Sequence, residues 1–188
     1  MATRMLTVKN RSASRVIYRI PEEHIRREFA PGEVKQISYD ELGKLSFQPG
    51  GRELMIEYLQ ITDEMALRSV GIKAQPEYYM SEAQVIDLMR TGTYEAFLDC
   101  LDFAPTGIID LIKKYAVSLP LNDYEKRKAL KEKTGFDVDR AIATAEEIKA
   151  DEKALANGEH GTSNEEKSVE IPSNGRRTSV NYKIVENK

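Results

Sequence analysis

Residues 81–119 read SEAQVIDLMRTGTYEAFLDCLDFAPTGIIDLIKKYAVSL, and this stretch decides the fold. Ser81 and Gln84 have the spacing of a capping box, in which the serine caps a helix and the glutamine reaches back to it. Thr91-Gly92 is a typical helix end. Apolar residues then recur at i, i+3, i+4 and i+7 from Tyr94, which predicts a second helix.

Three further helices complete a predicted bundle over residues 81–156. One begins at Thr106 and ends at Pro120, and a short basic helix spans residues 123–133. Asp137 caps the last helix, which we expect to pack for about three turns and then to extend into solvent or against a partner. The expected core of the bundle contains Leu98, Leu101, Ile108, Leu111 and Ile112. The apolar stripe of the last helix contains Val138, Ala141, Ile142, Ala145, Ile148 and Leu155.

Residues 1–72 have the pattern of a small β-rich domain, and residues 73–80 form a connector. Ser38 and Glu41 have the spacing of a second capping box. Residues 53–59 are too densely apolar to distinguish a helix from a strand. Short alternating segments predict strands at residues 5–8, 14–20, 25–30 and 34–38. The predicted fold class is therefore α+β, with a small antiparallel β domain, an α-helical bundle and an extended C-terminal tail.

The tail comprises residues 157–188. Its first part, residues 157–168, has almost no apolar side chains and cannot offset the entropy of ordering them. Its last part alternates like a strand but is too short to form a sheet alone. We therefore expect it to pair with an edge or groove of a partner, with two arginines on the acceptor's carboxylates. The predicted partner-binding residues are Arg176, Arg177, Val180, Tyr182 and Ile184.

The sequence contains no recognisable catalytic constellation. His24 and His160, its only histidines, have no cysteine, histidine or carboxylate at metal spacing. The single cysteine, Cys100, lies on an apolar helix face and is expected to be a buried small hydrophobe. The glycines form no phosphate-binding loop, and no apolar run is long enough to span a bilayer. We predict a protein that is not an enzyme, without cofactor, metal, small-molecule substrate or membrane partner.

The basic helix supports an alternative function. Lys126, Arg127, Lys128 and Lys131 follow a proline turn with a spacing similar to that of a helix-turn-helix, and such a helix can contact nucleic-acid phosphates. The alternative is a cytoplasmic nucleic-acid-binding or regulatory protein. The strands also carry four arginines that favour either a small positive patch or a solvated face: Arg15, Arg19, Arg26 and Arg27.

Several segments together resemble an uncharacterised family of tailed-phage proteins. They are RREFAPGEVK (residues 26–35), LSFQPGG (45–51), PEYY (76–79), FAP (103–105) and KTGFD (133–137), with the Arg176-Arg177 tail. None of these segments is a catalytic motif. The resemblance implies a virion structural or head-associated role, in which the protein is made in the host cytoplasm and binds other virion proteins or copies of itself.

Overall fold

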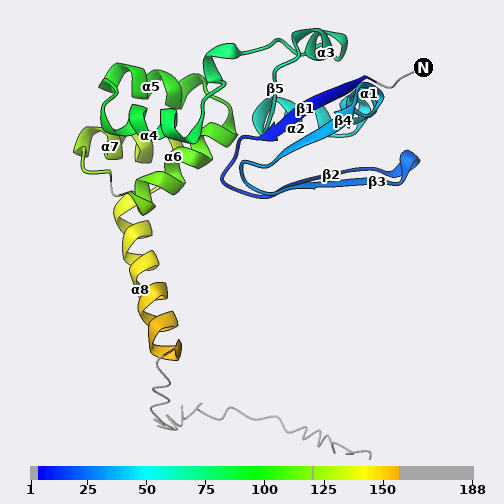
Figure 1. Cartoon of the computed structure of the whole chain (residues 1–188). Coiled ribbons are helices and arrows are strands. Elements are labelled where there is room, and N and C mark those ends of the chain that lie inside the picture. Colours follow the sequence, from blue (N-terminus) through cyan, green and yellow to red (C-terminus); the bar gives the residue numbers. More distant parts are fainter. Residues whose placement is uncertain (1–3, 120, 157–188) are drawn as a thin grey trace, which may run out of the picture.

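The computed structural model describes residues 4–119 and 121–156, and within them it has the predicted α+β class. Figure 1 shows a β unit on one side, a helical bundle on the other, and a last helix that runs away from the bundle. The strands are β1 (Met5–Asn10), β2 (Val16–Ile20), β3 (Ile25–Phe29), β4 (Val34–Ser38) and β5 (Leu59–Ile61). The helices are α1 (Tyr39–Phe47), α2 (Gly51–Glu57), α3 (Glu64–Ser69), α4 (Glu82–Arg90), α5 (Tyr94–Phe103), α6 (Thr106–Ser118), α7 (Tyr124–Thr134) and α8 (Val138–Ala156).

The β unit contains two small antiparallel sheets. β1 lies between β4 and β5, while β2 and β3 form a separate hairpin. Buried and exposed side chains alternate along β1 and β2, so each strand presents one apolar face to the interior. Helices α1, α2 and α3 pack with these strands around one core cluster between residues 6 and 72. The ambiguous segment 53–59 is helix up to Glu57 and strand from Leu59.

The predicted capping box at Ser38 is only half formed. The Ser38 hydroxyl accepts a hydrogen bond from the Glu41 backbone N–H at 3.0 Å, as predicted. The Glu41 carboxylate, however, faces the β2–β3 hairpin instead of Ser38. It accepts hydrogen bonds from the Tyr18 hydroxyl at 2.7 Å and from the Arg27 guanidinium at 2.9 Å through both oxygens. A buried carboxylate needs such charge-assisted partners, and they tie the hairpin to α1.

The helical bundle has its own core cluster between residues 85 and 138. The capping box at its start is confirmed, since Ser81 Oγ accepts from Gln84 N–H and Gln84 Oε1 accepts from Ser81 N–H. Four of the predicted core residues are buried: Leu101, Ile108, Leu111 and Ile112. The fifth, Leu98, is half-buried, because it packs at the edge of the cluster and not within it.

The bundle meets the β unit at the start of α6. The residue before this helix is Pro105, whose side chain makes no capping hydrogen bond. Glu57 at the end of α2 supplies the missing acceptor: its carboxylate binds the Thr106 backbone N–H and hydroxyl, both at 2.7 Å. Gly107 permits the close approach, because a Cβ there would lie 2.8 Å from Arg11 Cγ and 2.9 Å from the Glu57 carbonyl oxygen. The contact thus fixes α6 against the β unit.

Candidate functional site

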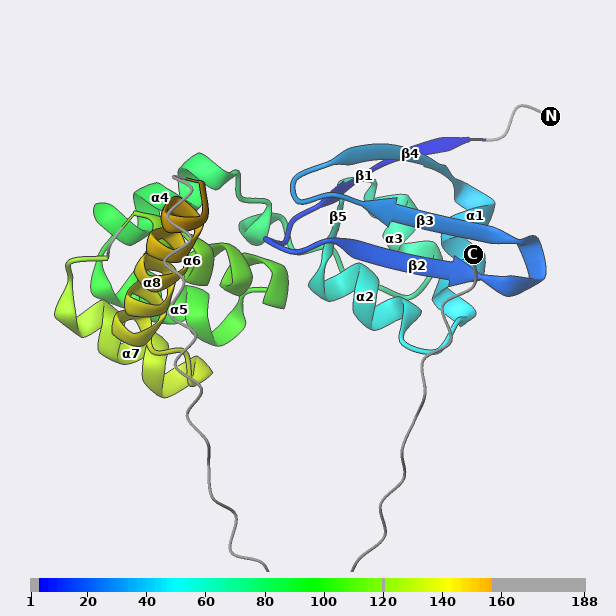
Figure 2. The same cartoon turned by 90° about the horizontal axis from the view of Figure 1, so that it is seen from below.

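Helix α8 is covered over its first part and uncovered over its last. Val138 is buried, and the three apolar residues of the next two turns are half-buried: Ala141, Ile142 and Ala145. Beyond them Ile148 is 53% exposed and Leu155 is 75% exposed. Figure 1 shows why: the helix leaves α6 and extends past the bundle. In the perpendicular view of Figure 2, α8 lies over the bundle and not over the β sheets.

The uncovered face of α8 combines apolar and acidic side chains. At 3.6 residues per turn, Ile148 and Leu155 lie on one face, seven residues apart. Asp151 and Glu152 lie between them on the same face, while Lys149 and Lys153 lie toward the opposite side. This face therefore exposes apolar and acidic side chains together.

Two ion pairs hold the base of α8 on α7. Lys131 Nζ lies 2.6 Å from Asp137 Oδ2, and Arg127 Nη1 lies 2.5 Å from Asp139 Oδ1. Asp137 also accepts a hydrogen bond from the Arg140 backbone N–H at 3.1 Å, so it caps the helix as predicted. The Lys131 ammonium and this backbone donor lower the pKa of the Asp137 carboxyl below its ordinary value.

The prediction that Lys126 contacts nucleic-acid phosphates is wrong. Lys126 is 3% exposed, and its ammonium points into the bundle. It donates hydrogen bonds to the carbonyl oxygens of Leu88 at 3.3 Å, Met89 at 3.0 Å and Gly92 at 2.6 Å. These carbonyls belong to the end of α4 and the turn that follows, where helical hydrogen bonding stops, so a cation there is favourable. Lys126 is therefore a helix cap and unavailable to any ligand.

The other predicted phosphate contacts stay predictions. Their side chains, however, lie close to carboxylates of the same chain, which leaves less positive charge for a ligand than the sequence suggested. Arg127 and Lys131 form the ion pairs to α8 described above. Lys128 is well exposed and lies 3.9 Å from Glu132 on its own helix. Three of the four arginines named for the β unit also pair with carboxylates: Arg15 and Arg26 pair with Glu28, and Arg27 pairs with Glu41.

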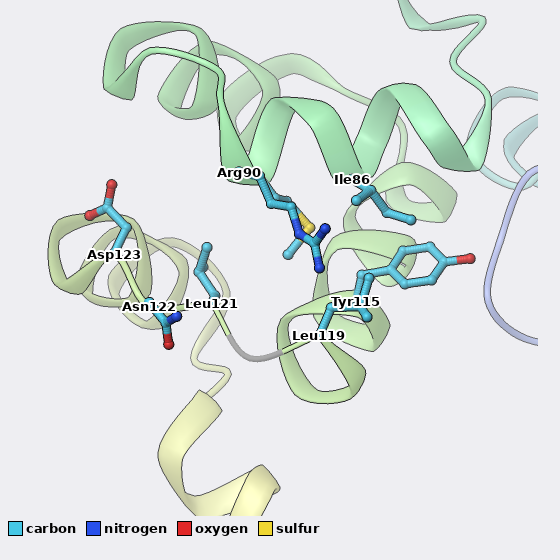
Figure 3. A pocket seen from close by; sticks show the side chains of 8 residues that line it. Ile86, Arg90, Tyr115, Leu119, Leu121, Asn122 and Asp123 are labelled. Carbon is cyan, nitrogen blue, oxygen red and sulfur yellow. The ribbon is translucent and has the colours of Figure 1, made fainter.

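A pocket of about 350 Å³ lies between α4, the end of α6 and the start of α7. In Figure 3, Ile86 and Arg90 point from α4 toward Tyr115 and Leu119 of the facing segment. Leu121 completes the apolar wall, and Asn122 and Asp123 lie at its edge. Four cations of α7 pair with carboxylates: Arg127, Lys128, Lys131 and Lys133. Arg90 of α4 has no carboxylate partner among the described residues. The pocket therefore combines an apolar wall with the Arg90 guanidinium and, at its edge, the Asp123 carboxylate.

The sequence did not predict this pocket, because its lining comes from three separate elements. Tyr115 was expected in the core stripe of α6, but it is half-buried and its hydroxyl donates a hydrogen bond to Glu82 at 2.5 Å. The hydrogen bond to the Glu82 carboxylate raises the pKa of Tyr115 to about 12. No local pattern in the sequence marks Arg90 or Leu121 as neighbours of Tyr115.

Further features considered in the sequence are a reactive cysteine, a metal site and a membrane span. Cys100 is buried, and burial with the nearby Asp99 charge raises the pKa of its thiol to about 11, which disfavours the reactive thiolate. Within residues 4–119 and 121–156, no group of His, Cys, Asp and Glu side chains has an arrangement suited to a metal ion. None of the helices in that part of the chain combines the length and the hydropathy needed to cross a lipid bilayer.

The predicted tail site lies outside the described residues. It comprises Arg176, Arg177, Val180, Tyr182 and Ile184. Comparisons of the chain with protein-family models, with curated proteins and with solved structures found no match.

Proposed function

We propose that the protein is a structural or assembly protein of a tailed-phage particle, and that it acts by docking on other proteins and not by catalysis. The observation that supports docking is the uncovered face of α8. Two large apolar side chains, Ile148 and Leu155, stand in solvent on a helix that extends beyond its own bundle. Exposed apolar surface of this kind marks protein-interaction sites. The phage setting rests on the sequence segments that resemble a tailed-phage family.

The test is mass spectrometry of purified particles of the phage that encodes the protein. We expect the protein in DNA-filled particles at a constant ratio to the major capsid protein. A particle-incorporation assay then links this result to α8: Leu155→Asp should reduce incorporation, whereas Lys153→Asp, on another face of the same helix, should not. Abundance in infected cells together with absence from particles would refute the proposal.

A nucleic-acid-binding role has less support. Lys126 is buried, and Arg127 and Lys131 are engaged with α8. We expect no shift of mixed DNA or RNA fragments in gels at low salt. A shift that weakens steeply as salt rises, and that disappears in Lys128→Glu, would favour the alternative, because phosphate contacts release counterions on binding.

A further inference from the structure

Two complementary features have no partner among residues 4–119 and 121–156. One is the uncovered face of α8, where Ile148 and Leu155 enclose two carboxylates. The other is the pocket between α4 and α6, where an apolar wall adjoins the Arg90 guanidinium (Figure 3). We infer that α8 of one copy docks in this pocket of a second copy. The inference rests on the proposed function and names the partner.

Two side chains of α8 match groups of the pocket, and the Asp123 carboxylate lies at the pocket edge. Leu155 is the most exposed large apolar side chain of α8 and is suited to the wall formed by Ile86, Leu119 and Leu121. Glu152 lies one turn before Leu155 on the same face. A leucine seated in the pocket therefore brings this carboxylate near Arg90, and such a pair fixes the register of the helix in the groove.

Two other arrangements are disfavoured by the structure. Helix α8 of the same chain runs away from the pocket, as Figures 1 and 3 show, so it does not reach it as a continuous helix. Two α8 helices paired face to face would oppose Asp151 and Glu152 of one copy with acidic residues of the other, and like charges across a contact are unfavourable.

The contact is heterologous, because the helix of one copy meets the pocket of the next. Each copy then offers one free helix and one free pocket, and such contacts generate rings when the rotation between copies closes and open chains when it does not. The inferred partner is thus a second copy of this chain, and the inferred assembly is a head-to-tail ring or chain.

The first test measures self-association of the full chain by sedimentation equilibrium. Leu155→Asp and Arg90→Glu should each raise the dissociation constant by at least about tenfold, because each removes half of the contact. Both residues are exposed, so neither change disturbs the fold. The matched controls are Lys153→Asp, on another face of α8, and Arg68→Glu, on α3; both should associate like the unchanged protein.

The second test distinguishes a heterologous contact from a symmetric one. The Arg90→Glu chain keeps a working helix and the Leu155→Asp chain keeps a working pocket, so an equimolar mixture should form a one-to-one dimer that does not grow further. The charge exchange Arg90→Glu with Glu152→Arg in one chain should restore association. Absence of the mixed dimer, or no rescue by the exchange, overturns the inference.

The third test addresses the tail as a competing occupant. A chain that ends at residue 168 lacks the predicted strand and both tail arginines but keeps α8 intact. It should associate like the full chain. Loss of association on this truncation, with Leu155→Asp unaffected, would identify the tail as the occupant.

A full chain that is monomeric at every concentration would overturn this inference alone, because docking on another virion protein needs no self-association. Self-association of a protein that is absent from particles would refute only the phage setting.

Discussion

Helix α6 and the distal part of α8 carry similar apolar stripes, but only the first is covered. In α6 the apolar face is continuous, and Ile108, Leu111 and Ile112 are buried in the bundle core. In α8 the face that holds Ile148 and Leu155 also holds Asp151 and Glu152. Carboxylates are costly to bury without partners, so this face is not suited to an intramolecular core. The spacing of apolar residues marks a face, and the charges between them decide whether it can enter the core.

The largest expected difference between the two helices is in stability. Leu111→Ala removes a buried side chain and should lower the free energy of unfolding by about 2–5 kcal/mol. Leu155→Ala removes an exposed one and should change it by less than about 0.5 kcal/mol. Urea denaturation followed by circular dichroism measures both. Equal effects of the two substitutions would show that the two helix faces do not differ in burial.

The same comparison applies to two lysines of α7. Lys126→Met leaves three carbonyl oxygens at the end of α4 without their donor and should cost about 2–3 kcal/mol. Lys128→Met, on the exposed side of the helix, should cost less than about 0.5 kcal/mol. Thermal and chemical unfolding of the two variants measure the difference. If Lys126→Met is as stable as Lys128→Met, the cap contributes nothing.

Two glycines differ in the space around them: the site of Gly107 is crowded, and the site of Gly43 is open. Gly107→Ala places a methyl group against Arg11 and the Glu57 carbonyl at the junction and should cost about 1–2 kcal/mol. Gly43→Ala, within α1, meets no atom within 4 Å and should stabilise the protein slightly, because alanine favours a helix. Calorimetric unfolding of the two variants distinguishes these outcomes. A stabilising Gly107→Ala would mean that α6 does not approach the β unit so closely.

The smallest expected effect concerns the pH dependence at the base of α8. Asp137 has a folded-state pKa below its ordinary value, so its contribution to stability is present above the unfolded pKa and is lost as the pH falls through the folded one. Asp137→Asn keeps an N-cap acceptor but removes the titration. The variant should therefore lose less stability on acidification below about pH 4. Parallel acid titrations of helicity would contradict the prediction.

Local signals predicted the parts of the fold that depend on neighbouring residues. Ser81 and Gln84 are three positions apart, and both hydrogen bonds of their capping box are formed. Glu41 has the same spacing from Ser38, yet its side chain serves Tyr18 and Arg27, which only the folded hairpin brings near. Sequence spacing indicates which local hydrogen bonds a side chain can form, and tertiary contacts decide whether it forms them or binds a distant partner instead.

The candidate site was predictable only in part. The exposed end of α8 followed from its thin stripe, and exposure of Ile148 and Leu155 agrees with that expectation. Burial of Lys126 had one signal that was missed: Ala129 and Leu130, its i+3 and i+4 neighbours, mark the apolar face of α7 and are buried with it. The pocket had no such signal, because its lining joins α4 to the segment between α6 and α7.

The junction at Thr106 and Gly107 has a mechanical consequence. Glu57 and the close backbone approach fix α6 on the β unit, and α6 in turn packs against the base of α8. Helix α8 has 19 residues and is therefore about 28 Å long. Because of this length, a tilt of about 10° at the base of the helix displaces its tip by about 5 Å. We expect a substitution at Gly107 or Glu57, far from Leu155, to change where the tip points. In the inferred head-to-tail assembly, it would also change the angle between successive copies.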